Sequence, residues 1–275
     1  MTVGETIITE PVPPRQDSYI HYAFNELNNP EFVDLALKVH AEGYTTMGYV
    51  SSDAVGADGA LLEAIDHARG VNTDYFLAVN PNEPSDMATM RKINIPAGGS
   101  IEELPAYQLS KVGLSVEGLS FLKALGENGL MVKEIAGLAR TKDASPACVY
   151  ELLRDVLQSA LGENEVWFFS IVSTTFDSLT RHFGKTAFTV IGDDVKINDS
   201  RVSESIQLRP TLLHPDRLFE SMITDIETAL SKRDQLRILK MFLYFTDGLQ
   251  DDELDLSVSN YRRNLLELLK GAQTN

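Results

Sequence analysis

The stretch from Met131 to Leu161 limits the possible folds more than any other part of the chain. An apolar run over residues 130–138 contains one glutamate, Glu134, and a short polar link then leads to Ser145-Pro146 and an amphipathic segment. Serine followed by proline is a typical helix start, so we predict a strand over residues 130–138 and a helix over about residues 146–161. The aromatic and β-branched run EVWFFSIVS that follows predicts another strand. A strand–helix–strand unit therefore lies in the middle of the chain.

Further strands are predicted on both sides of this unit. Residues 75–79 and 87–95 predict a hairpin around an Asn-Pro-Asn turn, and the runs TAFTVIG and SIQLRPTLL predict two more strands. Apolar residues at helical spacing follow Asn29-Pro30, and residues 59–70 form a short amphipathic segment. After His214 the pattern predicts two amphipathic helices. The sum is a mixed sheet with helices between strands and a helical tail, an α+β or α/β domain.

Composition excludes several classes of function. The net charge of −16 and the lack of a basic stripe argue against nucleic-acid binding. The sequence has neither an apolar run of about 18 residues nor a signal peptide, so we expect a cytoplasmic protein without a membrane span. The single cysteine, Cys148, excludes an internal disulfide and a multi-thiolate metal site, and the histidines lack metal-ligand spacing. We therefore expect no metal.

Five motifs occur in an order that identifies a possible family: HAEGYTTMGY, DYFLAV, ATMRKI, EIAGLAR and VSTTFDSLTRHFG. Together they resemble the GCN5-related N-acyltransferase superfamily and, within it, the acyl-homoserine-lactone (autoinducer) synthases and N-acyl amino acid synthases. The resemblance covers roughly residues 32–212. It divides the chain into an N-terminal arm (1–28), an acyltransferase domain (29–213) and a helical extension (214–275) packed on that domain. The extension would cover the sheet, form a homodimer contact or roof over a long acyl chain.

The resemblance implies both a fold and a reaction. The fold is α+β, with a central mixed, mostly antiparallel sheet flanked by helices, in which the strands at 130–138 and 165–173 splay apart as a V. The reaction is transfer of an acyl group from a thioester to the amine of a small molecule or amino acid by direct attack. No cofactor is tightly bound, because the co-substrate is an acyl-phosphopantetheine thioester on acyl carrier protein or coenzyme A. The alternative is a catalytically silent domain of this fold that binds a ligand or a protein.

Site residues follow from the same resemblance. Glu134 is the expected catalytic base, since partial burial raises a carboxyl pKa. Arg91 would pair with Glu134, an acidic substrate or a donor phosphate, although an ordinary surface ion pair accounts for either residue as well. The predicted acceptor and acyl site is a loop with Tyr44, Met47 and Tyr49, which packing onto the domain would also explain. The predicted donor-binding residues are Leu138, Ala139, Arg140, Thr141, Lys142, Ser145, Ser173 and Phe183.

The chain also departs from these relatives. Coenzyme A-dependent members carry a glycine-rich loop between this strand and helix, whereas ARTKDASPAC has no glycine. That difference favours a carrier-protein donor or an unusual donor-binding loop, with Arg140, Lys142 and the helix dipole supplying positive charge. Homoserine-lactone synthases have Glu-Ile-Ser-Arg where this chain has Glu-Ile-Ala-Gly at residues 134–137, so Gly137 replaces the arginine. Cys148 near the helix start could be a reactive thiol, but a buried small apolar side chain is the stronger interpretation.

Overall fold

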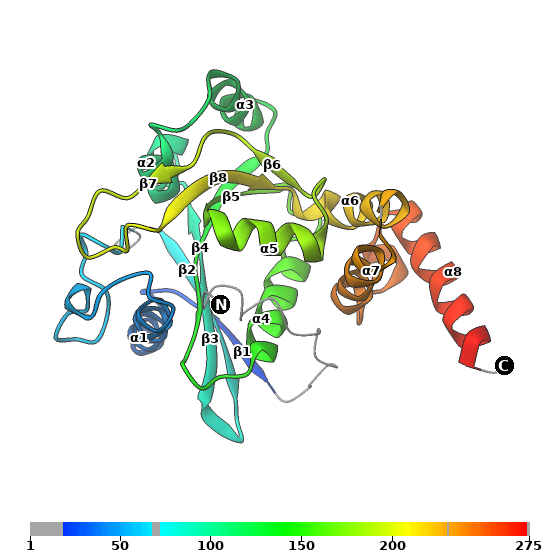
Figure 1. Ribbon diagram of the computed structural model, residues 1–275, viewed down its shortest axis with the longest axis horizontal. Helices are drawn as coiled ribbons and strands as arrows, with labels where there is room; N and C mark the ends of the chain where they lie inside the picture. Colours follow the sequence, from blue (N-terminus) through cyan, green and yellow to red (C-terminus); the bar gives the residue numbers. More distant parts are fainter. Residues whose placement is uncertain (1–18, 68–71, 230, 274–275) are drawn as a thin grey trace.

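A mixed sheet runs through the whole molecule (Figure 1). The computed structural model describes residues 19–67, 72–229 and 231–273. The strand order is β1-β2-β3-β4-β5-β8-β6, and β7 pairs with β8. Strands β4 and β5 are parallel, and the other pairs are antiparallel. The strands are β1 Ile20–Phe24, β2 Thr73–Asn80, β3 Glu83–Asn94, β4 Met131–Arg140, β5 Glu165–Val172, β6 Phe188–Val190, β7 Val195–Lys196 and β8 Gln207–Leu213.

Helices cover both faces of this sheet, as the predicted α+β class requires. In Figure 1, α1 lies on one side of β2 and β3 and α4 on the other, while α6, α7 and α8 follow at one end. The helices are α1 Pro30–Thr46, α2 Pro105–Ser110, α3 Val116–Glu127, α4 Pro146–Ser159, α5 Ser173–Phe183, α6 Pro215–Thr228, α7 Lys232–Thr246 and α8 Leu256–Gln273.

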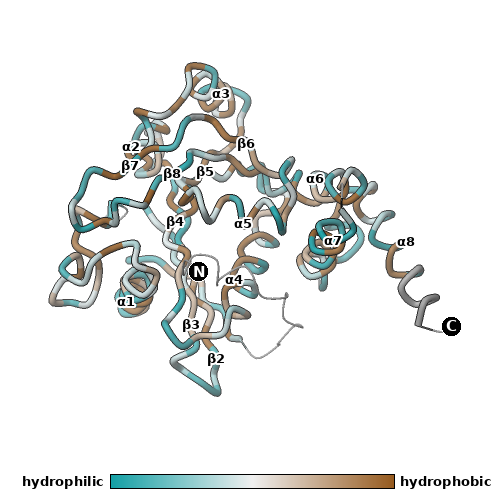
Figure 2. Tube along the Cα trace, in the orientation of Figure 1, coloured by the Kyte–Doolittle hydropathy of each residue, from teal (hydrophilic) through white to brown (hydrophobic). Residues whose placement is uncertain are grey.

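Side chains of β2 point alternately to the two faces of the sheet, which explains why an apolar cluster forms on each face of this strand. Tyr75 and Leu77 pack in one cluster with the apolar residues of α1, whereas Phe76 and Ala78 pack in another with those of α4. Successive strand residues point to opposite faces, so a strand with apolar residues at every position is buried on both sides. The hydropathy colouring in Figure 2 shows apolar residues along the inner strands and α4.

Strands β4 and β5 separate into the predicted V. They pair only over Met131–Glu134 and Glu165–Phe168. Beyond Phe168, β5 continues beside β8, while β4 continues beside β3. Glu165 lies at the closed end, where its buried carboxylate accepts hydrogen bonds from Lys92 Nζ at 3.1 Å, from Lys133 Nζ and from Trp167 Nε1 at 2.9 Å. These contacts join β3, β4 and β5 at one point.

A β-bulge interrupts β4 where the V opens. Thr89 lies opposite Ala139 but Arg91 lies opposite Ala136, so β4 has one extra residue in this interval. Gly137 in the bulge has φ of +65°, and a Cβ there would come within 2.8 Å of Arg91 Nε. Both the backbone conformation and the space therefore require glycine at this position.

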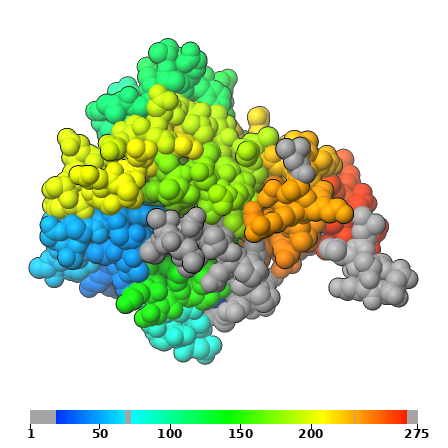
Figure 3. Space-filling view, viewed as in Figure 1, coloured from blue at the N-terminus to red at the C-terminus, as the bar shows by residue number. Residues whose placement is uncertain are grey.

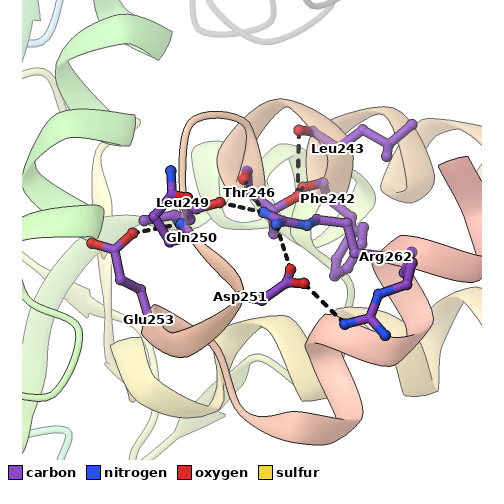
Figure 4. A network of polar contacts seen from close by, with 9 residues as sticks. Phe242, Leu243, Thr246, Leu249, Gln250, Asp251, Glu253 and Arg262 are labelled. Atoms are coloured by element: carbon purple, nitrogen blue, oxygen red, sulfur yellow. Dashed lines mark hydrogen bonds and ion pairs between the residues drawn. The ribbon is translucent and has the colours of Figure 1, made fainter.

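The C-terminal helices share the core of α4 and α5. Met222 of α6 and Phe242 of α7 are fully buried in the same cluster as residues of α4. Arg262 of α8 donates to the carbonyl oxygens of Thr246 at 2.8 Å and Leu249 at 2.9 Å, and to Asp251 Oδ1 at 2.9 Å (Figure 4). This arginine fastens α8 to the end of α7.

The structure differs from the sequence-based expectations in several places. Strand β1 pairs with β2 although its residues fall in the range assigned to the N-terminal arm. Helix α1 continues through Gly43 to Thr46, where the sequence predicted a loop, and the described part of the amphipathic segment, residues 59–67, consists mainly of turns and bends. The described residues after His214 form three helices, α6, α7 and α8, rather than the two predicted. The loop before β8 packs against the segment that follows α1, since Ser51 N donates to the Arg201 carbonyl at 2.8 Å; Figure 3 shows the two segments in contact.

Candidate active site

Two cavities adjoin at the bulge of β4. The apolar cavity, about 180 Å³, opens between the splayed strands and extends toward α4, α5, α6 and α7. Its lining includes Met90, Leu138, Val149, Leu153, Leu157, Trp167, Phe169, Leu179, Phe183, Leu218 and Phe245. The polar cavity, about 150 Å³, lies on the α1 side and is lined by His40, Asp66, Arg91 and Glu134 among others. Residues shared by both linings are Tyr44, Tyr49, Ile135, Ala136, Gly137, Ser170 and Val172.

Glu134 is a buried carboxyl group facing the polar cavity. It is 4% exposed, and its Oε2 accepts a hydrogen bond from the Ala106 backbone N–H at 2.6 Å. Burial raises the pKa of Glu134 to about 7, against the lowering effects of the Ala106 hydrogen bond and the nearby Arg91 charge. A carboxyl group with such a pKa exchanges protons near neutral pH, which suits a general base.

Arg91 pairs with a residue that the sequence analysis did not consider. Its Nη1 donates to both oxygens of Asp66, at 2.7 and 2.8 Å, and both side chains are buried. The expected ion pair between Arg91 and Glu134 is therefore replaced by one with Asp66, and Arg91 acts on Glu134 only through its charge. Sequence pattern could not have found Asp66, because it lies in the irregular segment 59–67.

His40 adds an unpartnered polar group to the same cavity. Its two ring nitrogens are buried and have no hydrogen-bond partner among the described residues, and Nδ1 lies 3.9 Å from Asp66 Oδ2. Burial lowers the pKa of His40 to about 3, so the ring is neutral at physiological pH. The Tyr44 ring contacts it edge-on, with centroids 4.1 Å apart. A buried ring with unused nitrogens is suited to accept a polar ligand group.

The predicted acceptor and acyl residues lie at the junction of the cavities, although on different elements than expected. Tyr44 belongs to the last turn of α1, Met47 is its C-terminal cap, and only Tyr49 lies in the loop. All three line the apolar cavity. The Tyr49 hydroxyl is 3.2 Å from Thr175 Oγ1 of α5, so this side chain reaches across the open end of the V.

The predicted donor-binding residues fall into two groups. Leu138, Ala139, Arg140 and Phe183 line the apolar cavity. The hydroxyl groups of the second group bind their own surroundings instead: Ser173 Oγ donates to Asp194 Oδ2 at 2.8 Å, and Ser145 Oγ caps α4 by accepting from Ala147 N at 3.2 Å. The second group is Thr141, Lys142, Ser145 and Ser173.

Cys148 is a core residue and not a nucleophile in this structure. Its side chain is fully buried. Burial raises the pKa of the Cys148 thiol, with the neighbouring Asp86 carboxylate acting in the same direction. The lowering expected from the helix dipole is outweighed, so the apolar interpretation is the one that the structure supports.

The splayed mixed sheet is the fold expected from the resemblance to the GCN5-related N-acyltransferases, and a solved structure shares it. Among solved structures, FeeM, an N-acyl amino acid synthase from uncultured soil microbes, is similar to this chain with a TM-score of 0.51 and 19% identity over 74% of this chain and 94% of FeeM. MesI, a coenzyme A-dependent acyl-homoserine lactone synthase, gives a TM-score of 0.49 and 10% identity over 84% of this chain and 97% of MesI. No family model and no curated protein matches the sequence.

The described residues contain neither a membrane-spanning helix nor a cluster of metal-binding side chains. Within residues 19–67, 72–229 and 231–273, no helix combines the length and apolarity needed to cross a membrane. The same part of the chain has no group of three or more histidine, cysteine, aspartate or glutamate side chains that could hold a metal ion.

Proposed function

We propose that the protein transfers an acyl group from an acyl thioester to the amine of a small molecule. The observation that carries the proposal is the meeting of an apolar and a polar cavity at Gly137 and Ser170, with Glu134 on the polar side. An acyl chain fits the first environment and a charged or polar amine the second. The thioester carbon would then lie between them.

The open V offers a path for the pantetheine arm of the donor. Beyond Glu134, the side of β4 that faces β5 pairs with no strand among the described residues. Backbone N–H and C=O groups there are free to bind amides of the arm, since such groups need partners when water is excluded. N–H groups at this edge could also stabilise the oxyanion that forms as the amine attacks.

The proposed chemistry uses Glu134 as a base. The amine arrives as an ammonium ion and gives a proton to the ionised carboxylate, directly or through one water. Its nitrogen lone pair attacks the thioester carbon and the C–N bond forms. As the C–S bond breaks, the nitrogen releases its second surplus proton to water, which leaves a neutral amide. The thiolate leaves with the bonding electrons and takes the proton back from Glu134. No acyl-enzyme is needed, which agrees with the buried Cys148.

The two linings define the substrates more closely. The apolar cavity continues past Leu153 and Leu179 to Leu218 and Phe245 of the C-terminal helices, so we propose a medium or long acyl chain. The unused nitrogens of His40 and the buried Arg91 favour an acceptor that carries a second polar group, such as the carboxylate of an amino acid.

The proposal is tested by incubating the protein with fatty acyl-pantetheine thioesters and a panel of amino acids and amines. Thiol release should accompany a mass gain on the amine equal to the acyl group minus one hydrogen. Binding of thioester without any release of thiol would favour the alternative of a catalytically silent ligand-binding domain. Absence of both binding and turnover would refute both functions.

A further inference from the structure

Most backbone N–H groups in the link between β4 and α4 already donate to acceptors within the chain. Helix N-termini normally bind anions because their first N–H groups are free. Here acceptors of the chain itself take the N–H groups at this end, at distances of 2.9 to 3.2 Å. The N–H groups concerned are those of Thr141, Lys142, Ala144, Ser145, Ala147 and Cys148. Pro146 has no N–H to offer.

Asp86 of β3 places a carboxylate at this helix end. Its side chain is buried, and Oδ1 accepts from Ser145 N at 3.0 Å. Its Oδ2 accepts from the Tyr19 hydroxyl at 2.6 Å and from Asn80 Nδ2 at 3.2 Å. A negative charge at the positive end of a helix is stabilising, so Asp86 fills the position that an external anion would otherwise take.

Surrounding charges also disfavour a phosphate. The Glu42 carboxylate accepts from Lys142 N at 2.9 Å, and Arg140 uses Nη1 to bind the Ala144 carbonyl oxygen. The cations Arg140 and Lys142 thus share this region with three carboxylates, those of Glu42, Asp86 and Asp143. The local balance is negative, so the positive charge expected here from the sequence is cancelled.

We propose that Asp86 is an internal substitute for a donor phosphate, and that the protein recognises the acyl and pantetheine parts of its donor without holding a nucleotide diphosphate at α4. The inference rests on the proposed acyl transfer. It assigns the donor to the class of pantetheine thioesters borne by a carrier without an adenine nucleotide. The apolar cavity and the open edge of β4 supply the recognition.

A series of donors with one acyl chain tests this. Acyl-pantetheine, acyl-phosphopantetheine and acyl-coenzyme A are compared by kcat/KM with the full chain, and by Kd using thioether analogues that cannot react. Both quantities should agree within about threefold across the series, whereas two charge-assisted hydrogen bonds to a diphosphate would favour coenzyme A by about a hundredfold or more. Agreement in Kd supports the inference even if nothing turns over, in which case only the proposed reaction fails. Preferential binding of the coenzyme A analogue overturns it, as does failure of all three to bind.

Variants sharpen the same test. Asp86→Asn keeps an oxygen acceptor for Ser145 but removes the charge, so the affinity ratio of the coenzyme A analogue to the pantetheine analogue should rise by about threefold or more. Asp155→Asn also removes one carboxylate charge but lies in α4 away from the N-terminus of that helix. It is the matched control and should leave the affinity ratio unchanged. If Asp86→Asn does not fold, Glu42→Gln, at the exposed carboxylate of α1 that contacts the link, should shift the ratio in the same direction. A ratio that stays constant in the charge-removing variants would contradict the inference.

Discussion

The two cavities share one stretch of β4 but differ in the ionisable groups that line them. The apolar cavity is walled by residues gathered from α1 to α7, whereas the polar cavity contains the buried ion pair of Arg91 with Asp66, the Glu134 carboxyl group and the His40 ring. A bulged strand separates them, so neighbouring positions of one segment serve an apolar and a polar reactant. Under the proposed function, the two reactants of the acyl transfer would therefore bind on opposite sides of a single strand.

Removal of the Glu134 carboxyl group from the polar cavity should reduce activity more than any other change. Glu134→Gln keeps the acceptor for Ala106 N–H but cannot take a proton, so kcat/KM should fall by about 10²–10⁴-fold in a thiol-release assay. Glu127→Gln, at the exposed end of α3, is the control and should retain full activity. Activity within about threefold of the unaltered protein would exclude Glu134 as the base, because base catalysis typically contributes at least a hundredfold.

Lowering the pH should weaken the polar side in a graded way. With the pKa of Glu134 at about 7, kcat/KM should fall about tenfold per pH unit below 7, and Glu134→Gln should lack this limb. The raised pKa means that the folded protein favours the protonated group, so stability is lost as pH rises from about 4.5 to 7. The difference in the free energy of unfolding between Glu134→Gln and the unaltered protein should therefore shift in favour of the variant by up to about 3 kcal/mol between pH 4 and pH 8, measured by urea unfolding.

Obstruction of the apolar side should affect long acyl chains alone. Leu153 is only half-buried and lines the apolar cavity, so Leu153→Trp adds volume there with little strain on the core. The ratio of kcat/KM for a long-chain to a short-chain thioester should fall about tenfold, since loss of a few buried methylenes at roughly 0.8 kcal/mol each accounts for that change. An unchanged ratio would place the acyl chain elsewhere.

The smallest effect is expected at Cys148. Cys148→Ala removes a buried thiol that takes no part in the proposed transfer, so kcat/KM should stay within about twofold while stability falls by about 1 kcal/mol. Loss of activity in a variant with intact thermal unfolding would instead indicate an acyl-enzyme intermediate on this thiol.

Sequence pattern predicted the strands at the centre of the fold and located Glu134 correctly on β4. Apolar alternation and the Ser145-Pro146 start carried enough information for that, because they are local. The pairing of Arg91 with Asp66 could not be predicted, since Asp66 lies in an irregular segment 25 residues earlier in the chain. The unbonded nitrogens of His40 could not be predicted either, because they depend on the packing around this ring. Asp86 was missed for the same reason: its significance comes from contact with Ser145, the N-cap of α4, which follows it by 59 residues in the chain.

Glu165 has a consequence for how the protein binds a donor. Its bonds with Lys92, Lys133 and Trp167 pin three strands at the closed end of the V, so the strands are already apart before a ligand arrives. Binding of a donor would then carry no free-energy cost for separating the strands, so its affinity would reflect its own contacts with the protein more fully. The cleft is built rather than induced, and an arm of the right width should enter it without a slow rearrangement of the sheet.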